Sequence, residues 1–211
     1  MDDEYIGIKV TLIGESSVGK TCIINRFCKD LFSRDIDSTL GANYSQKRIE
    51  RKGKKIRLDL WDTAGEEKYR AIGRHFYKES YIVCLVYDIT NKESFENLKK
   101  IWYPELKEYG EEYKIIALIG NKLDLYLEEA VNEEEGKKFA NEINAVFKRT
   151  SALEGLGLDD LFNELVDKYL DEIQNDIKKN DNEKKGDNNN NNKNIVINKE
   201  DAEKPNKRRN C

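Results

Sequence analysis

The sequence predicts a doubly wound α/β domain, with a six-stranded, mainly parallel sheet and helices on both faces. Strand patterns and helix patterns alternate along most of the chain, which is typical of this architecture. Residues 81–87 and 115–119 are continuous apolar runs, as expected of strands that are buried on both faces of a parallel sheet. A glycine-rich loop also stands between the first strand pattern and the first helix pattern. These observations together predict a sheet whose ligand lies beyond the carboxyl ends of its strands.

Six segments have strand patterns, at about 6–13, 43–51, 55–61, 81–87, 114–119 and 145–149. Lys52-Gly53-Lys54 is typical of a hairpin turn, so we expect the second and third strands to be antiparallel. In the third strand Ile56, Leu58 and Leu60 alternate with charged residues, which indicates one wetter face.

Three helix patterns matter most for the fold. The first follows the glycine-rich loop directly. The second runs from Phe95 to Leu106 and contains Pro104, which lacks a backbone N–H and therefore predicts an irregularity. The last is the clearest, because apolar residues recur at helical spacing from Leu158 to Tyr169.

Composition excludes several classes of protein. The net charge of −4 over 211 residues is too small to favour nucleic acid as a partner. Residues 1–5 are acidic and lack the apolar stretch of a signal peptide, and no run approaches the ~20 apolar residues of a membrane span. The four cysteines have no close pairing and fit a reducing compartment; Cys22, Cys28 and Cys84 are expected to be small core residues. Because His75 is the only histidine, a metal site of several histidines is excluded; a His-based catalytic triad is possible in principle, but we expect His75 to be a structural or surface residue.

The composition changes at about Asn180. Beyond it the chain is rich in Asn, Lys and Glu, includes the run Asn188–Asn192, and has few apolar residues to offset the entropy of ordering. We therefore expect a folded domain over residues 1–179 and a disordered tail over 180–211 that ends in Cys211.

The most specific motif of the chain is the loop Gly14-Glu15-Ser16-Ser17-Val18-Gly19-Lys20-Thr21. Its glycines let backbone N–H groups turn inward around an anion, and the start of the next helix adds partial positive charge. Lys20 offers a full charge to outer phosphates, and the Thr21 hydroxyl is a suitable ligand for Mg²⁺. A chance glycine-rich turn is the alternative, but a strand before the loop and a helix after it favour a nucleoside triphosphate site.

Three further loops follow predicted strands. Asp62 can hold Mg²⁺, usually through a water, and Gly65 can offer its N–H to a terminal phosphate. Within residues 121–124, the Asp124 carboxylate can accept two hydrogen bonds from guanine, a donor pair that adenine lacks. The amides of Thr150-Ser151-Ala152 can meet the guanine carbonyl. Each of these loops taken alone could be an ordinary polar loop without a function. Because all of them follow strands of one sheet, however, they together predict a binding site for a guanine nucleotide.

With these motifs, residues 5–175 resemble the small GTPases of the Ras superfamily, and most of all the Rab branch. The motifs that carry the resemblance are the phosphate loop, Trp-Asp-Thr-Ala-Gly (61–65), Leu-Val-Tyr-Asp-Ile-Thr (85–90) followed by Ser94-Phe95, Asn-Lys-Leu-Asp (121–124) and Thr-Ser-Ala (150–152). Residues 102–105 faintly resemble Rho proteins, but the short span between Asp124 and Thr150 leaves no room for a Rho-type insert helix. A nuclear-transport relative would be expected to end in an acidic tail without a terminal cysteine, so this branch does not fit well either.

The resemblance implies roles for matching positions. Thr39 would give its hydroxyl to Mg²⁺ and its N–H to the γ-phosphate, and Phe32 would pack edge-on against guanine. The implied metal ligands are Thr21, Thr39 and Asp62, and the implied effector-binding aromatics, which composition alone would place in the core, are Tyr44, Trp61 and Phe76. The predicted nucleotide-binding residues are Gly14, Glu15, Ser16, Ser17, Val18, Gly19, Lys20, Thr21, Cys22, Phe32, Thr39, Gly65, Asn121, Lys122, Asp124, Ser151, Ala152 and Leu153.

The chain departs from the family pattern in three places. Glu66 stands where the family usually has glutamine; an ionised glutamate only accepts hydrogen bonds and adds negative charge near the phosphates, although a raised pKa would restore a donor. Leu153 replaces a common lysine whose stem packs on the base, a contact that leucine retains. The chain ends without a C-a-a-X box, so one prenyl group on Cys211, helped by residues 207–209, would give only reversible membrane attachment. An unmodified Cys211 is the alternative.

The predicted function is a Mg²⁺-dependent switch that binds GTP, hydrolyses it to GDP slowly with Glu66 and Lys20 as catalytic residues, and regulates membrane traffic. The alternative is a GTP-binding module with little hydrolysis because of Glu66. A P-loop kinase or ATPase is disfavoured by Asn121 and Asp124. The implied partners are an exchange factor, an activating protein that supplies an arginine, a GDP-dissociation inhibitor or escort protein, and effectors. The expected location is cytoplasmic and peripheral on an endomembrane.

Overall fold

The computed structural model describes residues 4–34, 36–65, 76, 79–110 and 115–190, from 176 onward by backbone alone. The chain divides into two units, Met1–Leu170 and Asp171–Cys211. The first unit contains the sheet and every predicted site residue except Cys211. Glu66 and Cys211 lie outside the described residues, as does the tail beyond residue 190.

The six strands are β1 (Ile6–Ile13), β2 (Ala42–Arg51), β3 (Lys54–Thr63), β4 (Ile82–Asp88), β5 (Ile115–Asn121) and β6 (Val146–Arg149). They form one sheet in the order β2-β3-β1-β4-β5-β6. Only β2 and β3 are antiparallel, and the remaining neighbours pair in parallel. The predicted sheet and its antiparallel hairpin are both confirmed.

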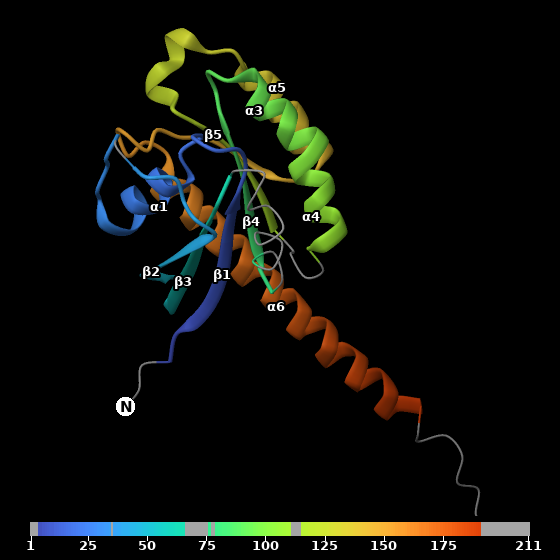
Figure 1. Cartoon of the computed structure of the whole chain (residues 1–211). Coiled ribbons are helices and arrows are strands. Elements are labelled where there is room, and N and C mark those ends of the chain that lie inside the picture. Colours follow the sequence, from blue (N-terminus) through green and yellow to red (C-terminus); the bar gives the residue numbers. More distant parts are fainter. Residues whose placement is uncertain (1–3, 35, 66–75, 77–78, 111–114, 191–211) are drawn as a thin grey trace, which may run out of the picture. The chain divides into compact units, whose positions relative to one another are not determined.

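The helices of the described residues are α1 (Lys20–Lys29), α3 (Lys92–Asn97), the π-helical turn η2 (Leu98–Trp102), α4 (Tyr103–Tyr109), the 3₁₀ segment η3 (Leu123–Glu128), α5 (Glu133–Glu142) and α6 (Leu158–Asn190). Figure 1 shows α1 and the beginning of α6 on one face of the sheet, and α3, α4 and α5 on the other. Phe27 of α1 stacks on Phe162 of α6 with 3.9 Å between ring centroids. On the opposite face Phe95, Trp102 and Phe139 belong to one buried cluster with β4 and β5. The doubly wound architecture is therefore confirmed.

The irregularity predicted at Pro104 is a π-helical turn. Pro104 has no N–H to donate four residues back along the helix. Immediately before it, the Tyr103 N–H donates to the carbonyl of Leu98, a five-residue step. The helix predicted from Phe95 to Leu106 is thus a series of α3, η2 and α4.

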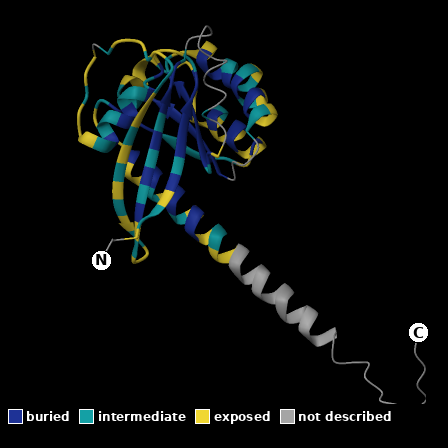
Figure 2. Cartoon of the chain, turned by 60° about the horizontal axis from the view of Figure 1, so that its bottom comes forward, coloured by how far each residue is buried: buried dark blue, intermediate teal, exposed yellow. Residues whose placement is uncertain are grey.

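Burial follows the apolar pattern of the sequence. Every residue of β4 and β5 is buried, whereas the edge strand β2 has no buried residue, and Figure 2 shows this contrast between dark blue central strands and a teal and yellow edge. Cys84 is buried as predicted, but Cys22 and Cys28 are only partly buried, because their positions on α1 do not face the sheet fully.

The helix α6 is helical to Asn190, beyond position 180 where the tail was expected to begin. Its polar second half belongs to the second unit, which begins at Asp171. The boundary at residues 179 and 180 stays a prediction. Within the described part of the chain, none of the helices combines the length and hydropathy of a transmembrane segment.

Candidate functional site

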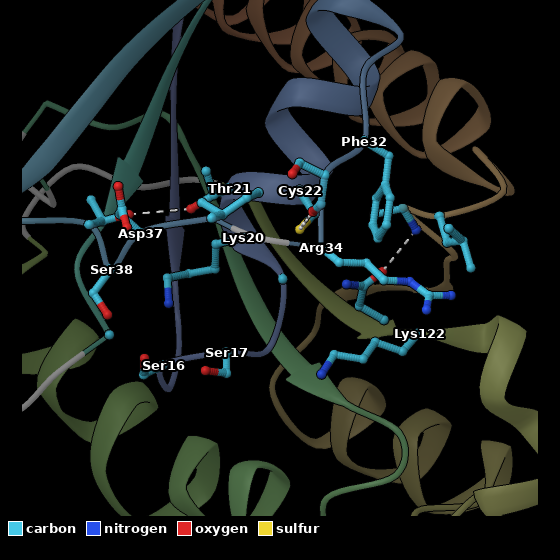
Figure 3. Close-up of a pocket in the computed structure, with 18 of the residues that line it drawn as sticks. Ser16, Ser17, Lys20, Thr21, Cys22, Phe32, Arg34, Asp37, Ser38 and Lys122 are labelled. Carbon is cyan, nitrogen blue, oxygen red and sulfur yellow. Dashed lines mark hydrogen bonds between the residues drawn. The ribbon is translucent and has the colours of Figure 1, made fainter.

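A cavity of about 550 Å³ opens where the predicted loops leave the carboxyl ends of the strands. Figure 3 shows Lys20 near its centre, with Phe32 and Lys122 on one side and Asp37 and Ser38 on the other. The predicted nucleotide-binding residues that line it are Ser16, Ser17, Gly19, Lys20, Thr21, Cys22, Phe32, Thr39, Gly65, Asn121, Lys122, Asp124, Ala152 and Leu153.

The cavity lacks some of the predicted nucleotide-binding residues and includes others that were not predicted. Gly14, Glu15, Val18 and Ser151 are not part of it, whereas Ser33, Arg34, Ile36, Asp37, Ser38, Thr63 and Leu125 are. The segment between Phe32 and Thr39 has no motif of its own, so only its position between two predicted residues could have indicated it. Thr63 is buried and donates its hydroxyl to the Leu12 carbonyl, a contact between strands that the sequence does not reveal.

The phosphate loop can only be built with glycine at its two ends. A Cβ on Gly14 would lie 2.2 Å from the Val86 carbonyl oxygen, and a Cβ on Gly19 would lie 2.3 Å from Asn121 Nδ2. Gly19 also has a φ of 96°, which side chains rarely allow. The loop is therefore packed closely against β4 and β5, and Ser16, Ser17 and Gly19 of the loop line the cavity.

Lys20 begins α1 and is 6% exposed. Its Nζ donates to the carbonyls of Gly14 (2.8 Å) and Glu15 (2.7 Å), which hold the ammonium group within the loop. Burial lowers the pKa of Lys20 to about 8, although the carboxylates of Asp62 and Glu15 act in the opposite direction. Lys20 is thus a cation at neutral pH, poorly solvated and placed to gain from a nearby anion.

We expect the affinity for a nucleoside diphosphate to fall as the pH rises through about 8. Bound phosphates stabilise the charged form and raise the pKa of Lys20, so binding takes up a proton between the free and bound pKa values. The affinity should then fall by at most about tenfold per pH unit. Titrations with GDP from about pH 7 to about pH 9 measure this slope, and calorimetry in two buffers measures the proton uptake. In Lys20→Met the slope should disappear; an equal slope in that variant would assign it to another group.

Three oxygen-bearing side chains meet beside Lys20. Asp62 Oδ2 accepts from the hydroxyls of Thr21 (2.7 Å) and Thr39 (3.1 Å), and these two hydroxyl oxygens lie 3.3 Å apart. Asp62 is 2% exposed, and burial raises its pKa. Its Oδ1 is buried without a hydrogen-bond partner among the described residues. A buried carboxylate oxygen without a partner, beside two hydroxyls, fits a hard divalent cation that takes its other ligands from water and phosphate.

Asn121, at the end of β5, bonds to two other loops at the other end of the cavity. Its Nδ2 donates to the Val18 carbonyl at 2.9 Å, and its Oδ1 accepts from Thr150 Oγ1 (3.1 Å) and the Ala152 N–H (3.3 Å). At 1% exposure this amide connects the phosphate loop to the 150–152 loop. The sequence indicated Asn121 as a ligand contact and missed these bonds within the protein.

Ser151 and Lys122 have partners that fix the loop around Asp124. Ser151 is buried and donates its hydroxyl to Asp124 Oδ1 at 2.5 Å, so it orients the carboxylate from behind the cavity lining. Lys122 has a left-handed φ of 68°, and its Nζ lies 2.6 Å from Asp88 Oδ2. Asp124 is therefore a preoriented acceptor at the cavity wall.

The predicted aromatic trio lies together on the described surface. Tyr44 and Trp61 have ring centroids 5.3 Å apart, and Trp61 and Phe76 are 5.0 Å apart. Tyr44 is 50% exposed and donates its hydroxyl to Asp59 at 2.5 Å. The trio is thus a partly exposed aromatic patch, formed by Tyr44 of β2, Trp61 of β3 and Phe76, rather than core.

Comparison with known proteins gives consistent matches over most of the chain. The model of a family described as the Ras family matches residues 9–171. The rice (Oryza sativa subsp. japonica) Ras-related protein RGP2 is 40% identical over 167 residues, which cover 79% of this chain and 76% of the relative. Mouse (Mus musculus) Ras-related protein Rab-12 is 38% identical over 175 residues, 82% of this chain and 72% of the relative. Ras-related protein Rab-10 of Caenorhabditis elegans is 41% identical over 162 residues, 77% of this chain and 80% of the relative.

Proposed function

The chain belongs to the Ras family of small GTPases and is Rab-like, and from this premise we propose that it is a Mg²⁺-dependent GTP switch of vesicle traffic. Proteins of this family bind GTP and GDP with Mg²⁺ and hydrolyse GTP. The proposal goes further in assigning these tasks to the residues of the described cavity.

The oxygen cluster of Thr21, Thr39 and Asp62 is the observation that supports the proposal best. It lies beside the buried Lys20 and includes a carboxylate oxygen without a partner. Bound Mg²⁺ would supply charge neutralisation for the β- and γ-phosphates. Lys20 would bind the outer phosphates, and Asp124 would accept the two hydrogen-bond donors of guanine. Together these groups recognise both ends of a guanine nucleotide.

The segments that carry Thr39 and Gly65 would respond to the third phosphate. They are already connected, because the Ala64 N–H donates to the Gly41 carbonyl at 2.8 Å. Thr39 and Gly65 both line the cavity, so the γ-phosphate would hold both segments and its loss would release them together. Effectors would read this change at Tyr44, Trp61 and Phe76, which belong to or follow the same segments.

Changing Glu66 to glutamine is expected to alter the rate of GTP cleavage. A glutamine amide can accept from the attacking water and also donate toward the γ-phosphate, whereas an ionised glutamate only accepts and adds charge where phosphates are crowded. Single-turnover cleavage of GTP by the natural chain and by Glu66→Gln measures the difference, with GDP affinity as the control for intact binding. Indistinguishable rates would show that residue 66 does not limit hydrolysis. A natural chain that binds GTP but does not cleave it would favour the alternative, a binding module with little turnover.

The same proposal includes partners and a location. An exchange factor, an activating protein that supplies an arginine, a GDP-dissociation inhibitor or escort protein, and effectors would act on the switch. A prenyl group on Cys211 with the basic residues 207–209 would give reversible contact with an endomembrane from the cytoplasmic side.

A further inference from the structure

Arg26 reaches from α1 to the loop that forms one wall of the cavity. Its Nε donates to the Ala152 carbonyl and its Nη2 to the Leu153 carbonyl, both at 2.9 Å. Both bonds are partly buried, and the Arg26 side chain is 20% exposed. A guanidinium group is rigid and planar, so two bonds to successive carbonyls fix this piece of backbone in place.

The third nitrogen of the same side chain bonds to the residue that caps the end of α1. Arg26 Nη1 donates to the Asp30 carbonyl (3.1 Å) and to Asp30 Oδ1 (2.8 Å). Asp30 ends α1 in a left-handed conformation with a φ of 54°, and its N–H donates back to the Arg26 carbonyl. The chain continues from this cap to Phe32, which lines the cavity as Leu153 does. One guanidinium group therefore connects the 152–153 loop with the end of α1.

We propose that Arg26 is a positioning residue for the base end of the cavity, where it fixes the Ala152–Leu153 backbone and thereby slows release of the base. The proposal rests on the proposed function, because it takes guanine as the occupant. Arg26 is not among the lining residues, so it acts through the walls and not on the ligand.

The hydrogen bonds of Arg26 differ in how far they are exposed to solvent. The Asp30 side chain is 91% exposed, so its ion pair with Arg26 is solvated and contributes little. The bonds to Ala152 and Leu153 are partly buried, and without Arg26 these carbonyls lose a charged donor. The loop that carries Leu153 is therefore expected to depend on Arg26 more than the Asp30 cap does.

The experiment measures release of a fluorescent GDP, N-methylanthraniloyl-GDP, from the full chain in excess unlabelled GDP. We expect Arg26→Gln to release it about tenfold faster, the equivalent of about one charge-assisted hydrogen bond. Arg26→Lys keeps the charge but cannot bond both carbonyls in fixed geometry, so it should be intermediate. Asp30→Asn, which tolerates the left-handed conformation, is the matched control and should release GDP at the rate of the natural chain.

A second measurement separates positioning from general stability. ADP would bind through its phosphates without the guanine contacts, so its weak affinity should be the same in Arg26→Gln and in the natural chain. Unchanged GDP release in Arg26→Gln would overturn the proposal, and so would an equal loss of affinity for ADP and GDP. If the natural chain binds no GDP, the proposed function itself fails and this inference fails with it. If the natural chain binds GDP, the variants test Arg26 alone.

Discussion

Replacing Asp124 with asparagine is expected to change the preferred base of the chain from guanine to xanthine. In the proposed function the carboxylate would accept from the guanine N1–H and the exocyclic amine, and Ser151 fixes its orientation with a hydrogen bond of 2.5 Å. An asparagine in the same place offers one acceptor and one donor. Guanine then loses an acceptor for its amine, whereas xanthine, with a carbonyl at that carbon, gains a donor. We expect the affinity for GDP to fall by about a hundredfold or more, because a buried polar group is left without its partner.

The change of base preference is measured by letting GDP, xanthosine diphosphate and ADP each compete with a fluorescent nucleotide. Asp124→Ala is the control, because it removes the acceptor without supplying a donor and should weaken GDP without improving xanthosine diphosphate. An Asp124→Asn variant that retains the full preference for GDP would show that another residue reads the base.

A single methyl group at Gly65 is expected to abolish the response to the third phosphate while GDP binding remains. A Cβ at this position would lie 2.4 Å from the Glu15 carbonyl carbon and 2.4 Å from the Ser16 nitrogen. Both are backbone atoms of the phosphate loop, which cannot turn aside as a flexible side chain can. The segment that carries Gly65 must therefore move away from the phosphate loop. The Gly65 N–H then moves away from the expected position of the γ-phosphate.

Hydrogen–deuterium exchange in GDP and in a non-hydrolysable GTP analogue measures this effect. In the natural chain we expect the analogue to protect residues 36–44 and 61–65 relative to GDP. In Gly65→Ala this difference should disappear. Gly53→Ala is the control for a glycine substitution that meets no other segment, because a Cβ there would have nothing within 4 Å and its only strain is the local φ of 68°. A Gly65→Ala variant that keeps the protection difference would contradict the proposed role of Gly65.

Sequence reasoning was most successful where the signal is local. The apolar runs of β4 and β5 could be read directly, because strands covered on both faces exclude polar residues. The hairpin between β2 and β3 followed from one glycine-containing turn. The phosphate loop could be predicted equally well. Its glycines are required because the loop packs against β4 and β5 with no room for a side chain.

Contacts between distant segments could not be predicted in this way. The bonds of Arg26 to the 152–153 backbone span more than a hundred residues, and an arginine on a helix carries no sign that it will meet carbonyls of another loop. The same is true of the Asn121 bridge to Val18. The helical continuation of α6 to Asn190 was missed because that stretch lacks the apolar face on which the helix prediction depended.

The most direct test of the account is an equilibrium titration of the nucleotide-free chain with GDP and with ADP, each in the presence and absence of Mg²⁺. We expect GDP to bind at least about a thousandfold more tightly than ADP, because only guanine offers Asp124 its two donors. The account also predicts that removal of Mg²⁺ weakens GDP binding through the loss of the ion at Thr21 and Asp62. Equal affinity for the two nucleotides, or binding of GDP that is indifferent to Mg²⁺, would contradict it.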